Sequence, residues 1–259
     1  MSDVSLLMTR AYKEQMVIPG FNIPHLPMME PVVSALRDTE SFGLIEVARL
    51  EWEKFGARSL ADIRDTYEKC KDERFTRLHL DHVPVIDEDH KHLDYQAIIR
   101  EAIDLGYDSV MVDGSRLSLE DNIAATRWVV ELAHPEKIPV EGELGAVIGH
   151  EDGPMPPYEQ LFISKQGFTD LEEAGNFVKE TDVDWLSVAF GSIHGAISAG
   201  KRDKKKIEAR LDIEHLRKLQ NVAHIPMVLH GGSGIKRNSV QEAIKTRISQ
   251  INRCKKIRF

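Results

Sequence analysis

The stretch DSVMVDGSRLSLEDNIAATRWVVELAH, residues 108–134, decides how the chain folds. Residues 108–115 are a short apolar run typical of a buried strand, and residues 118–134 continue with the periodicity of an amphipathic helix. Ser118 and Asp121 have the spacing of a helix-capping box, which marks where the helix begins. A strand followed directly by a helix is the unit of parallel sheets, because the helix returns the chain to the end of the sheet where the strand began.

The same unit recurs along the whole chain. Strands are predicted at 16–23, 42–48, 75–82, 108–115, 138–147, 184–192, 225–234 and 248–252, and helices at 27–40, 59–71, 93–107, 118–134, 169–182, 211–223 and 239–247. Eight strands that alternate with helices favour an α/β fold, a closed (β/α)₈ TIM barrel, over a doubly wound open sheet. No linker divides the chain, so we expect a single TIM-barrel domain over residues 1–259.

The composition excludes several classes of protein. The chain is 42% hydrophobic and 29% charged, with a formal net charge of −8, which argues against a nucleic-acid binder or a protein of anionic membranes. It has two cysteines, Cys70 and Cys254, far apart in the sequence, and no secretory or membrane-spanning segment is recognisable. We expect a cytoplasmic protein.

Polar residues stand where packing alone does not require them, at the carboxyl ends of the predicted strands. Asp81 and His82 end the third strand, and successive strand residues point to opposite faces. Both can face the barrel mouth only if the strand breaks there, which the following Val83-Pro84 favours. His194 and His230 follow the sixth and seventh strands, so the three histidines are predicted to meet at one barrel mouth.

Three histidines with an open fourth position describe a catalytic zinc site. Any one of these histidines taken alone is better explained as a hydrogen-bonded structural residue. The fourth and fifth predicted strands add further acidic residues near this mouth, at Asp113, Glu141 and Glu143.

Two long loops and a glycine turn also follow strands, on the face where barrel active sites lie. Residues 149–168 and 195–210 are predicted to be lid or binding loops. The run HGGSG at 230–234 could cradle an anion at a helix N-terminus, although most such runs only form a tight turn. Lys201 is a weaker candidate for a phosphate contact.

Several ordered motifs resemble the class II, metal-dependent fructose-bisphosphate and tagatose-bisphosphate aldolases. They are LHLDH (78–82), SVMVDGS (109–115), VEGELG (140–145), GHED (149–152), VAFGSIHG (188–195) and VLHGGSGI (228–235), with GFNI (20–23) and ISQIN (248–252) in support. The family fold is a TIM barrel, in agreement with the strand count. The resemblance implies a lyase of carbohydrate metabolism and glycolysis, a sugar-phosphate substrate and a homodimer or homotetramer.

The resemblance also implies a role for individual residues. It makes Zn²⁺ the cofactor, with Na⁺ or K⁺ as a further candidate cation. Asp81 would be the acid/base on the aldehyde-derived oxygen, and Glu151 would exchange the carbon-bound proton of the substrate. The implied metal ligands are His82, His194, His230 and, in an alternative position, Glu143; the implied substrate and phosphate contacts are Asn22, Gly195, Gly231, Gly232, Ser233 and Asn252. Zinc would stabilise an enediolate, and no Schiff-base lysine would be needed.

Three departures from the family pattern stand out. After Asn252 the chain reads RCKKIRF and stops, so we expect a barrel that ends after its eighth strand and exposes apolar surface there. Glu46 and Arg49 are large and charged where the family has small polar residues; they either face the mouth and change the substrate, or pair with each other. Val83 replaces a glycine of the family. A metal-dependent lyase for another phosphorylated ketose and a non-catalytic metal- or phosphate-binding homologue therefore stay open as alternatives.

Overall fold

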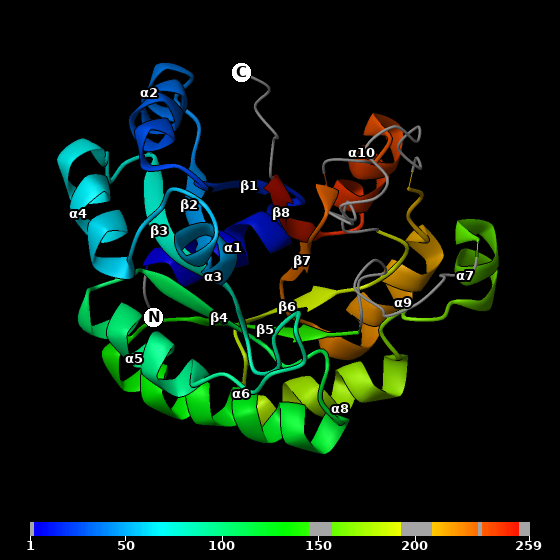
Figure 1. Ribbon diagram of the computed structural model, residues 1–259. Helices are drawn as coiled ribbons and strands as arrows, with labels where there is room; N and C mark the ends of the chain where they lie inside the picture. Colours follow the sequence, from blue (N-terminus) through cyan, green and yellow to red (C-terminus); the bar gives the residue numbers. More distant parts are fainter. Residues whose placement is uncertain (1–2, 146–156, 193–208, 233–234, 254–259) are drawn as a thin grey trace.

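The structure, a computed structural model, describes residues 3–145, 157–192, 209–232 and 235–253. Its strands form a closed barrel in chain order, and each strand pairs in parallel with its neighbours. Figure 1 shows the strands in the middle and the helices around them. The predicted (β/α)₈ TIM barrel is therefore confirmed, and an open sheet is excluded.

The order of the elements follows the predicted alternation, but strands six and seven are shorter than predicted. The strands are β1 (Ile18–Asn22), β2 (Gly43–Ala48), β3 (Thr76–Pro84), β4 (Ser109–Asp113), β5 (Val140–Leu144), β6 (Trp185–Val188), β7 (Met227–Leu229) and β8 (Ile248–Arg253). The helices are α1 (Asp3–Glu14), α2 (Met29–Asp38), α3 (Arg49–Glu53), α4 (Leu60–Cys70), α5 (Tyr95–Asp104), α6 (Leu119–Ala133), α7 (Tyr158–Ser164), α8 (Leu171–Thr181), α9 (Ile213–Ala223) and α10 (Arg237–Lys245), with 3₁₀ turns at Leu26–Met28 and His134–Glu136.

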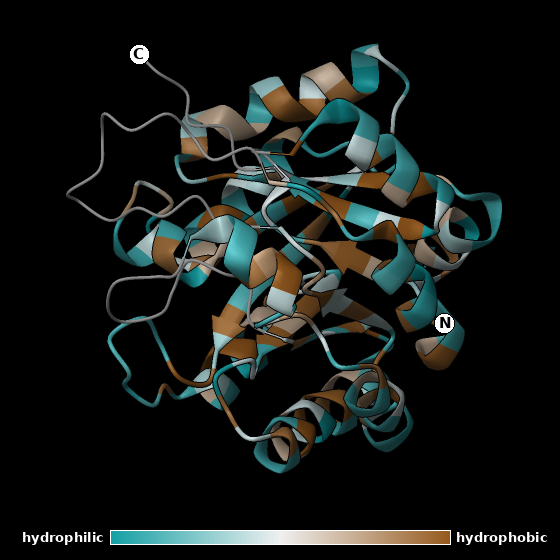
Figure 2. Ribbon diagram, turned by 90° about the vertical axis from the view of Figure 1, so that its right-hand side faces the viewer, coloured by the Kyte–Doolittle hydropathy of each residue, from teal (hydrophilic) through white to brown (hydrophobic). Residues whose placement is uncertain are grey.

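Ser118 caps α6 as its spacing predicts, and its hydroxyl accepts a hydrogen bond from the Asp121 amide at 3.2 Å. On the outer helices, hydrophobic and hydrophilic residues occupy different sides (Figure 2), as expected for helices that cover a barrel. Among the described residues, no helix combines the length and the apolar character needed to cross a bilayer.

The interior of the barrel changes from apolar at one end to polar at the other. At the amino ends of the strands a small apolar cluster closes the barrel, with α1 packed across it; its buried members are Val4, Met8, Ala11, Ile18, Leu44, Trp185 and Val228. Toward the carboxyl ends the inward positions carry Glu46, Glu141, Gln250 and His79, all 0% exposed. Fully buried polar groups need partners, so this half of the barrel is where a functional site is expected.

The end of the barrel differs from the expectation. β8 pairs with β7 and with β1, and its apolar residues are not exposed: Ile248 is 0% exposed and Ile251 is 5% exposed. Both belong to the main hydrophobic core together with Ala243 and Ile244 of α10. The prediction of exposed apolar surface on strand eight was therefore wrong, because the helix that precedes the strand already covers it.

Helices that the sequence did not predict are the other departure; two of them are short. The segment 149–168, predicted as one long loop, contains α7 over Tyr158–Ser164. α3 occupies Arg49–Glu53, directly after β2, and α1 precedes the first strand. Helices of five or seven residues are too short to give a clear periodic signal in the sequence.

Candidate metal centre and active site

β3 is irregular at Asp81 and His82, where the sequence predicts a break, although the strand itself continues to Pro84. His82 has a φ of 36°, and the register with β4 shifts between Leu80 and Val83. A positive φ is rare for residues other than glycine and strains the backbone. This irregularity lets both side chains reach the same barrel mouth, because the alternation of strand side chains is interrupted between them.

The imidazole rings of His82 and His230 face each other at this mouth. Nε2 of His82 and Nδ1 of His230 lie 2.5 Å apart, and the ring planes meet at 85°. The opposite ring nitrogens have carboxylate neighbours. His230 Nε2 is 2.9 Å from Glu141 Oε1, and His82 Nδ1 is 3.5 Å from Asp113 Oδ2 and 3.7 Å from Glu143 Oε2.

These neighbours decide which ring nitrogen carries the proton. A carboxylate accepts hydrogen bonds, so the Nε2–H of His230 donates to Glu141; Asn252 Nδ2, at 3.4 Å, is too distant to compete. His82 likewise turns Nδ1 toward Asp113 and Glu143. When both rings are neutral, the two nitrogens that face each other, His82 Nε2 and His230 Nδ1, therefore carry no proton and each presents a lone pair. Two lone pairs aimed at one point, with carboxylates behind the rings, are the donor set of a metal-binding histidine pair.

The surrounding charge favours a cation at this point. Burial lowers the pKa of His82, but the carboxylates of Asp81, Asp113 and Glu143 outweigh it and hold that pKa well above its ordinary value. Burial, together with the nearby Asp113, raises the pKa of Glu143 to about 8. Two groups of side chains have ligand atoms close enough to share one ion: Asp81 with His82 and His230, and His82 with Asp113 and Glu143. The residues therefore fit the divalent metal that the sequence predicts.

Asp81 is held by two amides that were predicted to contact the substrate. Asn22 Nδ2 donates to Asp81 Oδ2 at 2.8 Å, and Asn252 Nδ2 donates to Asp81 Oδ1 at 3.2 Å. Burial raises the pKa of Asp81, but the nearby histidines and the Asn22 hydrogen bond outweigh it and lower that pKa overall. Asp81 is thus a buried carboxylate, 2% exposed, beside the histidine pair. A carboxylate in this position can accept a proton from a substrate hydroxyl.

The glycine turn after β7 is described in part. Gly231 has a φ of 75°, and a Cβ on Gly232 would lie 2.7 Å from Ile251 Cγ2. Close packing against β8 therefore accounts for Gly232 without a ligand. Four predicted site residues lie outside the described residues: Glu151, His194, Gly195 and Ser233. So do Lys201, residues 149–156 of the first predicted lid loop and residues 195–208 of the second.

Glu46 and Arg49 do not pair with each other, so that expectation is wrong, whereas their effect on the substrate stays a prediction. Glu46 points into the barrel and accepts a hydrogen bond from Gln250 Nε2 at 2.9 Å. Arg49 begins α3 and pairs with Asp87 at 3.3 Å and Glu53 at 2.9 Å. The two residues separate because Glu46 is an inward position of β2, whereas Arg49 lies beyond the end of that strand.

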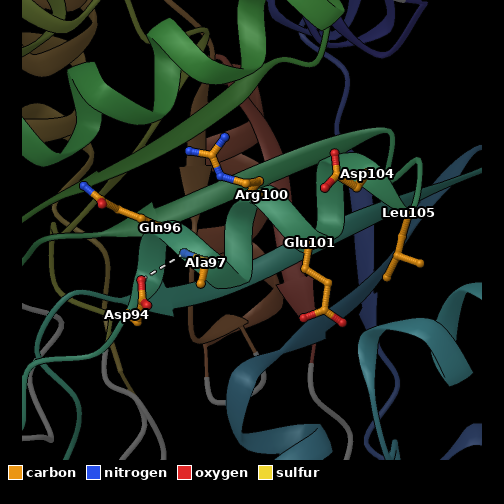
Figure 3. Close-up of a pocket in the computed structure, with 7 residues that line it drawn as sticks. All are labelled: Asp94, Gln96, Ala97, Arg100, Glu101, Asp104 and Leu105. Carbon is orange, nitrogen blue, oxygen red and sulfur yellow. Dashed lines mark hydrogen bonds between the residues drawn. The ribbon is translucent and has the colours of Figure 1, made fainter.

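Sequence reasoning did not assign a role to Glu141 or Gln250. Glu141 holds His230 and also accepts from Trp185 Nε1 at 2.8 Å, whereas Gln250 contacts Asn252. Gln250 could have been found from its spacing, because it is two residues before Asn252 on the same strand and so shares its face. A hollow on the solvent side of α5 contains none of the site residues; Figure 3 shows its lining, which includes Asp94, Arg100, Glu101 and Asp104.

Comparison with known proteins identifies relatives of one kind. Over 175 residues the chain is 37% identical to the 6-phospho-5-dehydro-2-deoxy-D-gluconate aldolase of Halalkalibacterium halodurans, a match that covers 68% of this chain and 52% of that protein. Over 172 residues it is 39% identical to the fructose-bisphosphate aldolase of Streptococcus pneumoniae, covering 66% of this chain and 52% of the relative. The chain thus spans about half the length of these two relatives.

Solved structures agree with the barrel. The crystal structure of the YdjI aldolase from Escherichia coli K12 superposes with a TM-score of 0.74 at 26% identity, covering 97% of this chain and 81% of that one. The family described as "Fructose-bisphosphate aldolase class-II" matches residues 2–259. This match spans the strands, the histidine pair and Asp81. The chain therefore belongs to the class-II fructose-bisphosphate aldolase family.

Proposed function

We propose that this chain is a metal-dependent aldolase that reversibly cleaves a phosphorylated ketose into dihydroxyacetone phosphate and an aldehyde. The observation that carries the proposal is the convergence of His82 Nε2 and His230 Nδ1 beside the buried carboxylate of Asp81. His194 would complete the ligand set, and Glu143 would be an alternative ligand. Zn²⁺ is the metal we propose, since three histidines are a usual set for catalytic zinc.

In this proposal each residue has one task. Asp81 accepts the proton of the C4 hydroxyl as the C3–C4 bond breaks, and the bonding electrons stay on the three-carbon fragment. The metal ion, when bound, polarises the ketone and offsets that negative charge. Glu151 returns a proton to the carbon, and the backbone around Gly195 and at Gly231, Gly232 and Ser233 holds the phosphate. Asn22 and Asn252 keep both oxygens of Asp81 in place.

Two substrate classes are in competition. Fructose or tagatose 1,6-bisphosphate is favoured by the sequence motifs, and fructose bisphosphate also by the name of the S. pneumoniae relative. 6-Phospho-5-dehydro-2-deoxy-D-gluconate is favoured by the H. halodurans relative, whose name states it. The cytoplasmic location and the homodimer or homotetramer stay predictions.

The test is a cleavage assay on all three substrates, before and after removal of metal with a chelator. We expect turnover of at least one substrate, its loss on chelation and its return with Zn²⁺. Activity that survives complete removal of metal contradicts the proposal. Stoichiometric metal without turnover on any phosphoketose would instead support a non-catalytic homologue.

A further inference from the structure

Four polar side chains form a continuous chain of hydrogen bonds across the interior of the barrel. Gln250 Nε2 donates to Glu46 Oε1 at 2.9 Å and to Asn252 Oδ1 at 3.0 Å. Asn252 Nδ2 then donates to Asp81 Oδ1 at 3.2 Å. All four are buried: Glu46 and Gln250 are 0% exposed, Asn252 is 6% exposed and Asp81 is 2% exposed. The chain links the middle of the barrel to the carboxylate at its mouth.

The direction of each bond follows from the one before it. A side-chain amide has an accepting end and a donating end, so its neighbours decide how it turns. The Glu46 oxygen is an acceptor, which turns the NH₂ group of Gln250 toward it. That NH₂ group also reaches Asn252 and therefore meets the amide oxygen of Asn252. The NH₂ group of Asn252 is then left to face Asp81.

The barrel is shaped around the Glu46 side chain. A Cβ on Gly20 of β1 would lie 1.9 Å from Glu46 Oε1, so any side chain at this position would displace the carboxyl group from its present place. Burial, together with Asp81 and Glu141, raises the pKa of Glu46 well above its ordinary value. Glu46 Oε1 can accept the Gln250 hydrogen bond whether the carboxyl group is ionised or protonated on Oε2.

The need to fill the barrel interior does not explain the pair formed by Glu46 and Gln250. Glu46 Oε2 and Gln250 Oε1 are buried and have no hydrogen-bond partner among the described residues. A buried polar atom without a partner costs stability, and apolar side chains of similar volume would fill the same space without that cost. The pair therefore serves something other than packing.

We propose that Glu46 is a positioning residue for Asp81. Acting through Gln250, it fixes which end of the Asn252 amide faces Asp81, and so fixes the orientation in which Asp81 receives the substrate proton. The inference rests on the proposed function, in which Asp81 acts on the hydroxyl and Glu151 acts on the carbon-bound proton.

Two substitutions that keep a similar side-chain volume interrupt the hydrogen-bond chain without adding a charge. Glu46→Leu removes the acceptor, and Gln250→Met removes the donor. Each should lower kcat for cleavage about 10- to 100-fold, because a misplaced catalytic group costs about that much. KM should stay within about threefold, since no substrate contact is removed. The double variant should be no slower than either single variant, because the residues act as one unit.

Three measurements separate positioning from general damage. Glu46→Gln keeps an accepting oxygen and should retain kcat within about threefold. Exchange of the carbon-bound proton of dihydroxyacetone phosphate with solvent should stay unchanged in Glu46→Leu, because that step does not use Asp81. Ser187→Ala is the matched control: Ser187 is also buried, at 0% exposed, and its Oγ has no partner in the described part of the chain, so kcat should not change.

The proposal is overturned if Glu46→Leu cleaves as fast as the parent protein, if Glu46→Gln is impaired as strongly as Glu46→Leu, or if proton exchange falls together with cleavage. If the parent protein itself turns over no substrate, the proposed function has failed, and crystallography then tests the hydrogen-bond chain independently. Crystals of Gln250→Met should show the Asn252 amide or the Asp81 carboxylate rotated from its place. If both side chains are unchanged, Gln250 does not orient them and the positioning role is refuted.

Discussion

Replacing Glu141 with glutamine should weaken metal binding without touching a metal ligand. Glu141 accepts two hydrogen bonds, from His230 Nε2 at 2.9 Å and from Trp185 Nε1 at 2.8 Å. Glutamine offers one acceptor and one donor. Because the tryptophan indole can only donate, the amide oxygen of Gln would turn to Trp185 and its NH₂ group would face His230. The proton of His230 would then move to Nδ1, the nitrogen that faces His82, and one of the two converging lone pairs would be lost.

The size of the effect follows from what metal binding would require of the variant. To free Nδ1, the amide must turn around and leave the Trp185 N–H buried against another donor. An unmet buried hydrogen bond costs about 1–3 kcal/mol. Since each tenfold change in affinity corresponds to about 1.4 kcal/mol, Zn²⁺ affinity should fall about 5- to 150-fold. This agrees with the loss of about 10- to 100-fold that is usual when a group supporting a metal ligand is changed.

Competition with a chromophoric chelator measures the affinity directly. Trp185→Phe removes the indole donor, so in the double variant Glu141→Gln with Trp185→Phe the amide is free to turn its oxygen toward His230. We expect the double variant to recover metal affinity relative to Glu141→Gln alone. Parent-like affinity in Glu141→Gln, or no recovery in the double variant, would show that Glu141 does not set the proton position on His230.

Three further predictions concern the same half of the barrel. Asp81→Asn should lower cleavage about 10²- to 10⁴-fold in a steady-state assay, as expected for loss of a general base, and full activity would exclude that role. Gly20→Ala should lower the free energy of unfolding by about 1–3 kcal/mol in urea titrations, because its Cβ overlaps Glu46; an unchanged midpoint would mean that the interior has room to spare. Burial raises the pKa of Glu51 from 4.5 to about 8, so the folded state keeps a proton that the unfolded state releases, and stability falls as pH rises through this window. Glu51→Gln should make that fall shallower in denaturation curves recorded between those pH values, and an equal slope would argue against a buried neutral acid.

Much of the fold could be read from local patterns. Residues 108–134 show a strand, a capping box at Ser118 and a helix in succession, and each signal lies within a few neighbouring residues. The irregularity of β3 at His82 was predictable as well, because Asp81 and His82 cannot share one face of a regular strand. The eight repeated units then left a closed barrel as the natural arrangement.

The connections inside the barrel could not be read in the same way. Glu46 and Gln250 are 204 residues apart in the sequence, and His230 and Glu141 are 89 apart. Their pairing depends on barrel register, which no local pattern specifies. Arg49 shows the same limit: its charge was visible in the sequence, but its partner Asp87 comes from a neighbouring strand end. Local periodicity predicts elements, whereas the partners of buried polar groups are set by the closed sheet.

We propose that His82 and His230 bind one divalent cation at the mouth of the barrel. Anomalous diffraction at the zinc edge, on crystals of the protein loaded with Zn²⁺, locates such an ion. We expect a single strong peak about 2.0–2.1 Å from both His82 Nε2 and His230 Nδ1. A peak elsewhere on the protein, or none at this mouth under stoichiometric Zn²⁺, would contradict it.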